Sequence, residues 1–242
     1  MSTYSEYDDF AYYYNKHWGT FNITLMKSVR ELFLKSLPAR GKILDLCCGT
    51  GQFANRLSSL GYDVTGIDIS KNMIEVAQSS KTKAKFIVGD ITDYYTGETY
   101  DGITSIFDSL NHILKEEDLG KVFQIAFNSL NKGGVLFFDM LMEEGFKDYW
   151  NSKNSKVTDN HVYIDNSYYD NETKLGTHVF TIFQNLDGWQ RIDGKVTERA
   201  YKLETVLNLL YAAGFDKCES FHFEKDLNIV NRNGRYLFVC KK

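Results

Sequence analysis

Proline and long apolar segments are scarce in this sequence. Among its 242 residues there is one proline, Pro38, and the longest apolar runs are short, such as Val135-Leu136-Phe137-Phe138. A membrane-spanning helix needs roughly 20 consecutive apolar residues, so we expect no membrane span. The first nine residues contain neither a basic start nor an apolar stretch, which argues against a secretory signal.

Cysteine is also scarce, and its spacing excludes two kinds of site. The four cysteines are Cys47, Cys48, Cys218 and Cys240, and no two of them have Cys-x-x-Cys spacing. This argues against a zinc ribbon and against a disulfide scaffold, and a reducing, cytoplasmic setting is the expectation. Four histidines are scattered without carboxylates at metal-ligand spacing, so we expect no metal site and interpret them as surface or core residues: His17, His161, His178 and His222.

The charge balance lacks the basic surplus that is typical of nucleic-acid-binding proteins. Lys and Arg total 28 while Asp and Glu total 32, which gives a net charge of −4. Because no basic stripe is present either, we expect no nucleic-acid partner. Aromatic residues are abundant instead, at 15% of the chain, which favours a thick core over an aromatic-lined pocket.

An alternation of strand and helix patterns begins after Pro38, which ends an N-terminal helical region at residues 1–38. The region contains five apolar segments that have the length of buried strands, and a helical stripe follows the first, the second and the fourth of them. These segments are 42–46, 62–67, 85–88, 100–107 and 135–140, the last preceded by a turn at 131–134. Repeated units of this length predict a mainly parallel sheet covered by helices on both faces.

A different pattern follows residue 145. The segments 161–164 and 177–183 are rich in β-branched and aromatic residues, and turn signals stand at 170–172, 187–188 and 193–194. Asp-Gly pairs such as the last two are typical of tight hairpins. The pattern predicts an antiparallel meander within a β-rich cap at 145–200. A helix near 203–211 and two strands near 215–223 and 235–240 complete the chain.

Three successive strand ends carry residues suited to an adenosine-containing ligand. Asp45-Leu46-Cys47-Cys48-Gly49-Thr50-Gly51 joins the first strand to a helix, whose first N–H groups can face an anionic group. Asp68 ends the second strand and can accept hydrogen bonds from ribose hydroxyls. Gly89-Asp90-Ile91 follows the third, where Asp90 can accept from an adenine amino group and Ile91 can pack on the ring. Each feature alone also fits a structural turn or a helix cap.

These motifs resemble the class I methyltransferases that use S-adenosylmethionine. Cys47 stands where many members have Gly, and the likeness extends through 66–70, 89–91 and 100–103. The resemblance implies a doubly wound, Rossmann-like seven-stranded sheet whose last strand is antiparallel. It also implies S-adenosylmethionine as cofactor, with S-adenosylhomocysteine as product, held by eleven residues. They are Tyr14, Asp45, Cys47, Gly49, Gly51, Asp68, Ile69, Met73, Asp90, Ile91 and Phe107.

A narrower resemblance is to bacterial small-molecule enzymes that include amino-sugar N,N-dimethyltransferases. It is carried by Tyr12-Tyr13-Tyr14-Asn15, by Phe107-Asp108-Ser109-Leu110-Asn111-His112 and by the β-rich insertion. It implies that Tyr14 closes the pocket near the methionine end of the cofactor and that His112 faces the substrate amine. Asn15 replaces an Asp that is common after this Tyr, and Asn111 occupies a position often held by Gly.

The expectation is therefore one α/β domain over 1–242, with a helical lid at 1–38, that methylates a small molecule, most readily at nitrogen. Several alternatives stay open. The protein could be a non-catalytic binder of the cofactor or an RNA methyltransferase, and a nicotinamide-dependent oxidoreductase is disfavoured by the missing G-x-G-x-x-G. His112 could be a loop histidine, and Asp108 and Asp139 could bind a substrate cation or cap the following segments. Oligomeric state is open, with a homodimer as one candidate.

Overall fold

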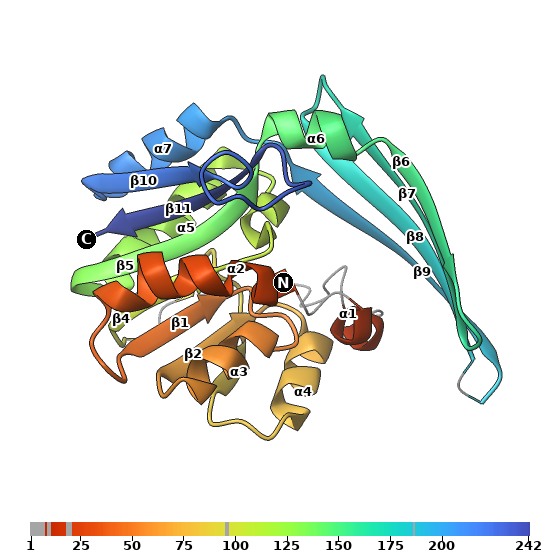
Figure 1. Ribbon diagram of the computed structural model, residues 1–242, viewed down its shortest axis with the longest axis horizontal. Helices are drawn as coiled ribbons and strands as arrows, with labels where there is room; N and C mark the ends of the chain where they lie inside the picture. The colour runs from red at the N-terminus through yellow and green to blue at the C-terminus, as the bar shows by residue number, and fades with distance from the viewer. Residues whose placement is uncertain (1–7, 9–10, 18–20, 95–96, 186) are drawn as a thin grey trace.

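The computed structural model describes residues 8, 11–17, 21–94, 97–185 and 187–242. Two sheets make up its architecture (Figure 1): a central seven-stranded sheet with helices, and a long four-stranded sheet that extends away from it. Among the described residues, no helix is long and apolar enough to cross a membrane. The same residues contain no group of three or more potential metal ligands.

The central sheet has the strand order β10-β11-β5-β4-β1-β2-β3. Its strands are β1 (Lys42–Leu46), β2 (Asp63–Asp68), β3 (Lys85–Val88), β4 (Tyr100–Ser105), β5 (Leu130–Leu141), β10 (Lys217–His222) and β11 (Arg235–Lys241). β11 runs antiparallel to both of its neighbours, and the other pairs are parallel. The doubly wound sheet and its antiparallel last strand are confirmed. The strand order reverses between β1 and β4, where such sheets bind ligands.

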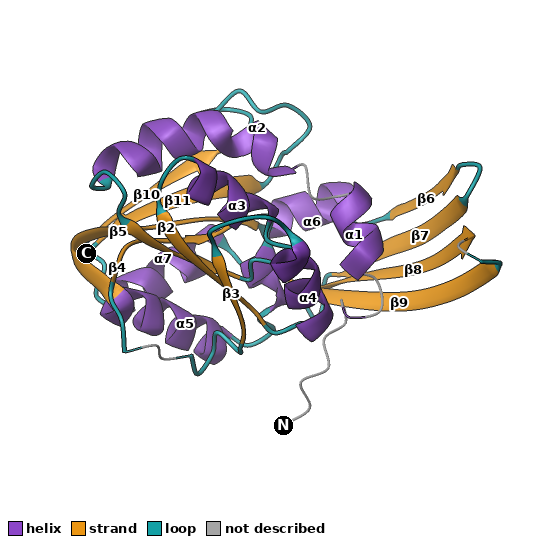
Figure 2. Cartoon of the chain, turned by 90° about the horizontal axis from the view of Figure 1, so that it is seen from below, coloured by secondary structure: helices purple, strands orange, loops and turns teal. Residues whose placement is uncertain are grey.

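Helices cover both faces of this sheet (Figure 2). One face packs against α2 (Phe21–Ser28), α3 (Gln52–Ser59) and α4 (Lys71–Ser79), and the other against α5 (Glu116–Ser129) and α7 (Leu203–Ala212). The apolar run of β5 supplies both cores, because Val135 and Phe137 point to one face while Leu136 and Phe138 point to the other. The helical region after α2 ends at Ser36, just before Pro38, as the sequence predicts.

The β-rich insertion follows β5 and forms what we call the cap sheet. A short helix, α6 (Glu143–Tyr149), leads into β6 (Ser152–Val157), β7 (His161–Asp170), β8 (Leu175–Asn185) and β9 (Trp189–Arg199). The four strands pair in sequence order, all antiparallel. The antiparallel insertion is confirmed, although the sequence pattern missed β6, whose polar residues Ser152–Val157 show no apolar alternation.

Two predicted turns are wrong. Asp193-Gly194 lies inside β9, where a Cβ on Gly194 would overlap the ring of Phe180 on β8. The glycine therefore leaves space for the ring of Phe180 on the neighbouring β8 and does not make a turn. Residues 131–134 belong to β5, whose register with β4 shifts between Tyr100 and Gly102, so the chain bulges there.

The first helix, α1 (Ala11–His17), lies between the central domain and the cap sheet (Figure 1). Residues 1–7, 9–10 and 18–20 of the expected helical lid lie outside the described residues. The position of α1 over the strand ends brings the N-terminal segment to the site described next.

Candidate active site

The loop after β1, residues 47–51, has the backbone shape of a ligand cradle, and we call it the cofactor loop. Cys47, Gly49 and Gly51 all have positive φ angles, of 54°, 53° and 76°. A Cβ at Gly51 would lie 2.6 Å from the ring of Phe86 and 2.9 Å from Cβ of Ala77, so only glycine fits. Cys47 carries a side chain in the same left-handed region, which the tight turn imposes on it.

Asp45 anchors the point where the strand order reverses. Its side chain is buried, and its Oδ1 accepts a hydrogen bond of 2.7 Å from Oγ1 of Thr104 on the adjacent β4. Burial raises the pKa of Asp45 to about 7, and the nearby charge of Asp68 acts in the same direction. The carboxyl group therefore holds its proton far more strongly than an exposed aspartate.

Asp68 joins the end of β2 to the cofactor loop. Its Oδ2 accepts from the N–H of Gly49 at 2.8 Å, and its Oδ1 accepts from the N–H of Ser70 at 2.9 Å. Burial raises the pKa of Asp68 although both hydrogen bonds oppose the rise. A carboxylate has about four acceptor positions, so these two bonds leave capacity for ribose hydroxyls.

The N-terminal segment is held over this site by contacts that the sequence pattern did not indicate. Ser70 caps α4 by accepting from the N–H of Met73 at 3.1 Å, and its hydroxyl donates to Asp8 at 2.5 Å. Nε2 of Gln52 donates to the backbone oxygen of Asn15 at 2.9 Å and to its Oδ1 at 2.7 Å. Asn15, which departs from the family pattern, thus bonds α1 to the first turn of α3.

Tyr14 lies beside the cofactor loop. Its Cε1 is 3.8 Å from where a Cβ on Gly49 would stand, and its ring centroid is 6.2 Å from that of Phe107. Burial raises the pKa of Tyr14 well above its usual value, and the carboxylates of Asp108, Asp68 and Asp139 add to this. The phenol therefore stays neutral at ordinary pH.

Behind Tyr14, the end of β4 is held by a buried ion network. Asp139 on β5 accepts from the N–H groups of Phe107 at 2.6 Å and Asp108 at 3.2 Å. Both of these residues have positive φ angles. Arg235 lies on β11, which is far along the chain but adjacent to β5 in the sheet, and it donates to Asp139 at 2.6 Å and also to Asp108. Asp108 and Asp139 are therefore already paired with a cation, which only the fold could reveal.

The remaining residues expected to bind the cofactor follow β2 and β3 or lie in the first turn of α4. Asp90 bonds locally, because its Oδ1 accepts from the N–H of Thr92 at 2.9 Å and from its hydroxyl at 2.8 Å. Ile91 and Met73 are buried, while Ile69 is 41% exposed. Asp90 thus makes the local turn that its alternative interpretation predicts, and it retains acceptor positions beyond those two bonds.

His112 ends a 3₁₀ turn, Ser109–His112, and faces the cap sheet. Its Nδ1 is 3.3 Å from the backbone oxygen of Thr197, and its Nε2 is 3.7 Å from Oε1 of Glu198. Burial lowers the pKa of His112, although the hydrogen bond to Thr197 and the charge of Asp108 oppose the change. A neutral imidazole that donates through Nδ1 has Nε2 as its proton-accepting nitrogen.

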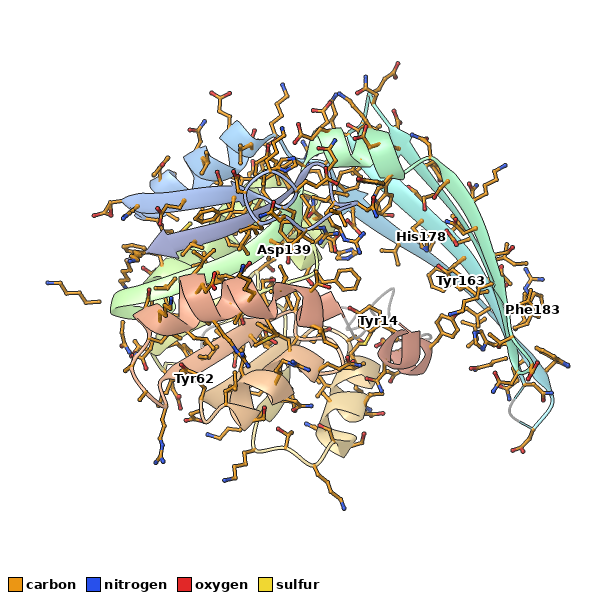
Figure 3. All side chains as sticks on the ribbon, in the orientation of Figure 1. Tyr14, Tyr62, Asp139, Tyr163, His178 and Phe183 are labelled. Atoms are coloured by element: carbon orange, nitrogen blue, oxygen red, sulfur yellow. The ribbon has the colours of Figure 1, made fainter. Side chains whose placement is uncertain are left out.

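A second histidine, His178 on β8 (Figure 3), lies on the same face of the cap sheet as Glu198, which is the cap residue near His112. Its Nε2 is 2.8 Å from Oη of Tyr163, and its Nδ1 is 2.9 Å from Oγ of Ser167 and 3.9 Å from Oδ2 of Asp165. The sequence pattern classed His178 as an ordinary surface or core histidine. Alternation along β7 and β8 is the signal that could have grouped these polar residues on one face.

Comparison with known proteins agrees with this geometry. Residues 43–134 match the family model described as "Methyltransferase domain". A protein of Bacillus subtilis (strain 168) that bears the name "Putative methyltransferase YqeM" is 30% identical over 187 residues, 74% of this chain and 75% of that protein. A dTDP-3-amino-3,4,6-trideoxy-alpha-D-glucopyranose N,N-dimethyltransferase of Streptomyces venezuelae is 26% identical over 50% of this chain and 52% of its own.

A solved structure shares nearly the whole fold. An S-adenosylmethionine-dependent methyltransferase from Clostridium acetobutylicum ATCC 824 superposes with a TM-score of 0.80 at 23% identity, covering 98% of this chain and 99% of that one. The family match spans the cofactor loop and the ends of β2, β3 and β4, where the candidate ligand-binding residues lie. The protein therefore belongs to the S-adenosylmethionine-dependent methyltransferases.

Proposed function

We propose that this methyltransferase transfers the methyl group of S-adenosylmethionine to a nitrogen atom of a small-molecule acceptor. In this proposal the acceptor lies between the cofactor loop and the cap sheet. The observation that carries the proposal is His112, a partly exposed imidazole that lies between the strand ends of the central sheet and Glu198 of the cap. The named activity of the Streptomyces venezuelae relative, an amino-sugar N,N-dimethyltransferase, supports the choice of nitrogen. Family membership argues against the nicotinamide-dependent alternative.

The residues around the cofactor loop fit an adenosyl sulfonium. In this proposal the backbone of the cofactor loop follows the cofactor, because Gly49 and Gly51 carry no side chains that would keep a ligand away from it. Asp68 accepts from the ribose hydroxyls through its remaining positions. Asp45 supports the loop from beneath through Thr104.

The adenine and methionine ends of the cofactor have separate partners. In this proposal Asp90 bonds the adenine amino group, and the apolar side chains of Ile69, Met73 and Ile91 enclose the adenosine. Tyr14 and Phe107 enclose the sulfonium end, where aromatic faces attract a cation. A neutral Tyr14 brings no additional charge to this end.

The cofactor supplies an electrophilic methyl group, so the protein's task is to position the acceptor and accept a proton. Holding the nucleophile in line at about 3–3.5 Å accounts for roughly 7–11 kcal/mol of barrier reduction in well-oriented reactions. An amine attacks only as the free base. The lowered pKa of His112 keeps its imidazole neutral and able to take the amine's proton, and the carboxylate of Glu198 stabilises the imidazolium that results.

The test replaces His112 with alanine and follows S-adenosylhomocysteine release with an amine acceptor and its matching alcohol. General-base catalysis contributes about 10²–10⁴-fold, so we expect His112→Ala to lower kcat by about 10²-fold while calorimetry shows unchanged S-adenosylhomocysteine affinity. Unchanged turnover at saturating amine would remove His112 from the mechanism. Turnover of the alcohol alone would exclude nitrogen as the methylated atom.

A further inference from the structure

One face of the cap sheet, which we call the inner face, is turned toward the central domain. The charged residues on this face favour some acceptors over others. Directly paired residues of adjacent strands share a face. The register therefore assigns each residue of β6 to β9 to one of the two faces of the cap sheet. This inner face carries Asn154, Lys156, His161, Tyr163, Asp165, Ser167, His178, Phe180, Ile182, Ile192, Val196 and Glu198. Figure 3 shows Tyr163 and His178 on this side and Phe183 on the opposite one.

Two pairs of histidine and carboxylate stand on or against the inner face. In the first, Nε2 of His112 is 3.7 Å from Glu198, and in the second, Nδ1 of His178 is 3.9 Å from Asp165. The two pairs have similar nitrogen–oxygen distances and similar exposure. The two imidazoles are about a quarter exposed, at 26% and 24%, while the carboxylates are 8% and 4% exposed. Each pair thus offers a polar imidazole backed by a buried acid.

The second pair is built into a wider polar cluster with an aromatic edge. Tyr163 and Ser167 each lie within hydrogen-bond distance of His178, and Nδ2 of Asn154 donates to Asp165 at 3.2 Å. The ring of Tyr13 from α1 stacks on Tyr163 with a centroid distance of 5.5 Å. Hydroxyl, imidazole and carboxylate groups beside stacked aromatic rings are the contacts that a hydroxylated amine uses.

Basic residues are concentrated on the opposite face. Alternation along β9 places Arg191, Lys195 and Arg199 outside. Among the described residues of the inner face, Lys156 on the edge strand β6 is the only lysine or arginine. Arg235, at the central strand ends, is committed to Asp108 and Asp139. Phosphate groups are bound by arginine, lysine or helix N-termini, and a diphosphate here would instead meet two buried carboxylates.

We propose that the His178–Asp165 pair is a second anchoring point for the acceptor and selects a hydroxylated amine without phosphate over a nucleoside-diphosphate-linked one. The inference rests on the proposed function, since it assumes that the acceptor lies against the cap. It separates this chain from its Streptomyces venezuelae relative, whose name specifies a dTDP-linked amino sugar. We call Asp165 and His178 specificity residues, because the proposal gives them a role in choosing the acceptor and none in transferring the methyl group.

The experiment titrates glucosamine and uridine-diphosphate-linked glucosamine into full-length enzyme saturated with S-adenosylhomocysteine. We expect glucosamine to bind at least about tenfold more tightly than the conjugate, a difference of about 1.4 kcal/mol. Equal or tighter binding of the conjugate would overturn the proposal, and so would failure of both probes to bind. This readout does not depend on methyl transfer, so methylation of alcohols alone would refute nitrogen transfer separately.

Variants of the cluster around His178 test whether it is the part of the protein that binds glucosamine. We expect Asp165→Asn to weaken glucosamine binding about fivefold or more while S-adenosylhomocysteine affinity changes less than about twofold. Asp193→Asn is the matched control, because Asp193 lies on the outer face of β9. Ser167→Ala, a smaller change on the same cluster, should also weaken glucosamine binding. Unchanged glucosamine affinity in folded Asp165→Asn and Ser167→Ala would overturn the assignment.

Discussion

At the scale of single residues, Asp45 and Asp68 have different roles in the candidate site. Asp45 is buried beneath the cofactor loop and bonds one neighbour, Thr104. Asp68 is bonded to two backbone N–H groups and retains acceptor positions toward the ligand. Asp45 lies inside β1 and Asp68 ends the neighbouring β2. Their different roles follow from their hydrogen-bond partners rather than from their residue type.

Removal of the Asp68 carboxylate should weaken cofactor binding. Asp68→Ala deletes the acceptor for Gly49 and Ser70 as well as the proposed ribose contact, and charge-assisted hydrogen bonds are worth about 1.5–3 kcal/mol each. We expect S-adenosylhomocysteine affinity, measured by calorimetry, to fall by about 10²-fold. Asp63→Ala, at the exposed opposite end of β2, is the control and should bind normally. Normal binding by Asp68→Ala would refute the ribose assignment.

The raised pKa of Asp45 makes folding stability depend on pH. The native state holds this proton up to about pH 7, whereas the unfolded chain releases it near 3.8. Over that interval the native state binds more protons, so this contribution to stability is lost as pH rises. We expect wild-type protein to lose about 3 kcal/mol relative to Asp45→Asn between about pH 4.5 and 7.

Denaturant titration of both proteins across this pH range measures the difference directly. Asparagine retains an oxygen that can accept from Thr104 and has no charge to bury. Parallel stability curves for the two proteins would show that Asp45 ionises normally.

At the scale of elements, the cap sheet depends on close contact between neighbouring strands. Gly194 leaves room for the ring of Phe180, and we expect Gly194→Ala to displace that ring and destabilise the protein by about 1–3 kcal/mol. Thermal unfolding measures the loss. Gly188→Ala is an informative control, because its Cβ would meet no atom within 4 Å although its φ is +126°. Gly194→Ala should therefore show the additional steric cost.

At the scale of the whole molecule, one buried amide joins the central sheet to the cap. Nδ2 of Asn111 donates to the backbone oxygen of Leu141 at 2.8 Å and to that of Arg199 at 2.9 Å. Its Oδ1 accepts from the N–H of Leu141 at 3.0 Å. Asn111, which differs from the glycine common at this position, therefore links the end of β9 to the end of β5.

Loss of this amide should loosen the cap while sparing the cofactor loop. Each buried backbone group left without its partner costs about 1–3 kcal/mol. Because Asn111→Ala removes the partner of three such groups, we expect the free energy of unfolding to fall by about 3 kcal/mol or more. We expect the acceptor KM to rise while S-adenosylhomocysteine affinity stays within about twofold. An unchanged KM would show that the cap does not need this anchor.

The central fold was predictable because its signals are local. Buried parallel strands read as short apolar runs separated by helical stripes, and the glycine-containing turn at 47–51 requires backbone angles that few other residues adopt. The strands of the cap were partly predictable for the same reason. β6 was missed because an exposed edge strand needs no apolar face, and Gly194 was misread because an aromatic ring, not a turn, requires it.

By itself the sequence determined the alternation of strands and helices in the central sheet, the position of the cofactor loop and the resemblance to the family to which the chain belongs. Only the tertiary structure decided which distant charges meet: Arg235 with Asp108 and Asp139, His112 with Glu198, and His178 with Asp165. The reason is physical. Local backbone preferences and apolar periodicity are encoded within a few residues, whereas a buried ion pair forms where packing brings together segments that are up to 127 residues apart.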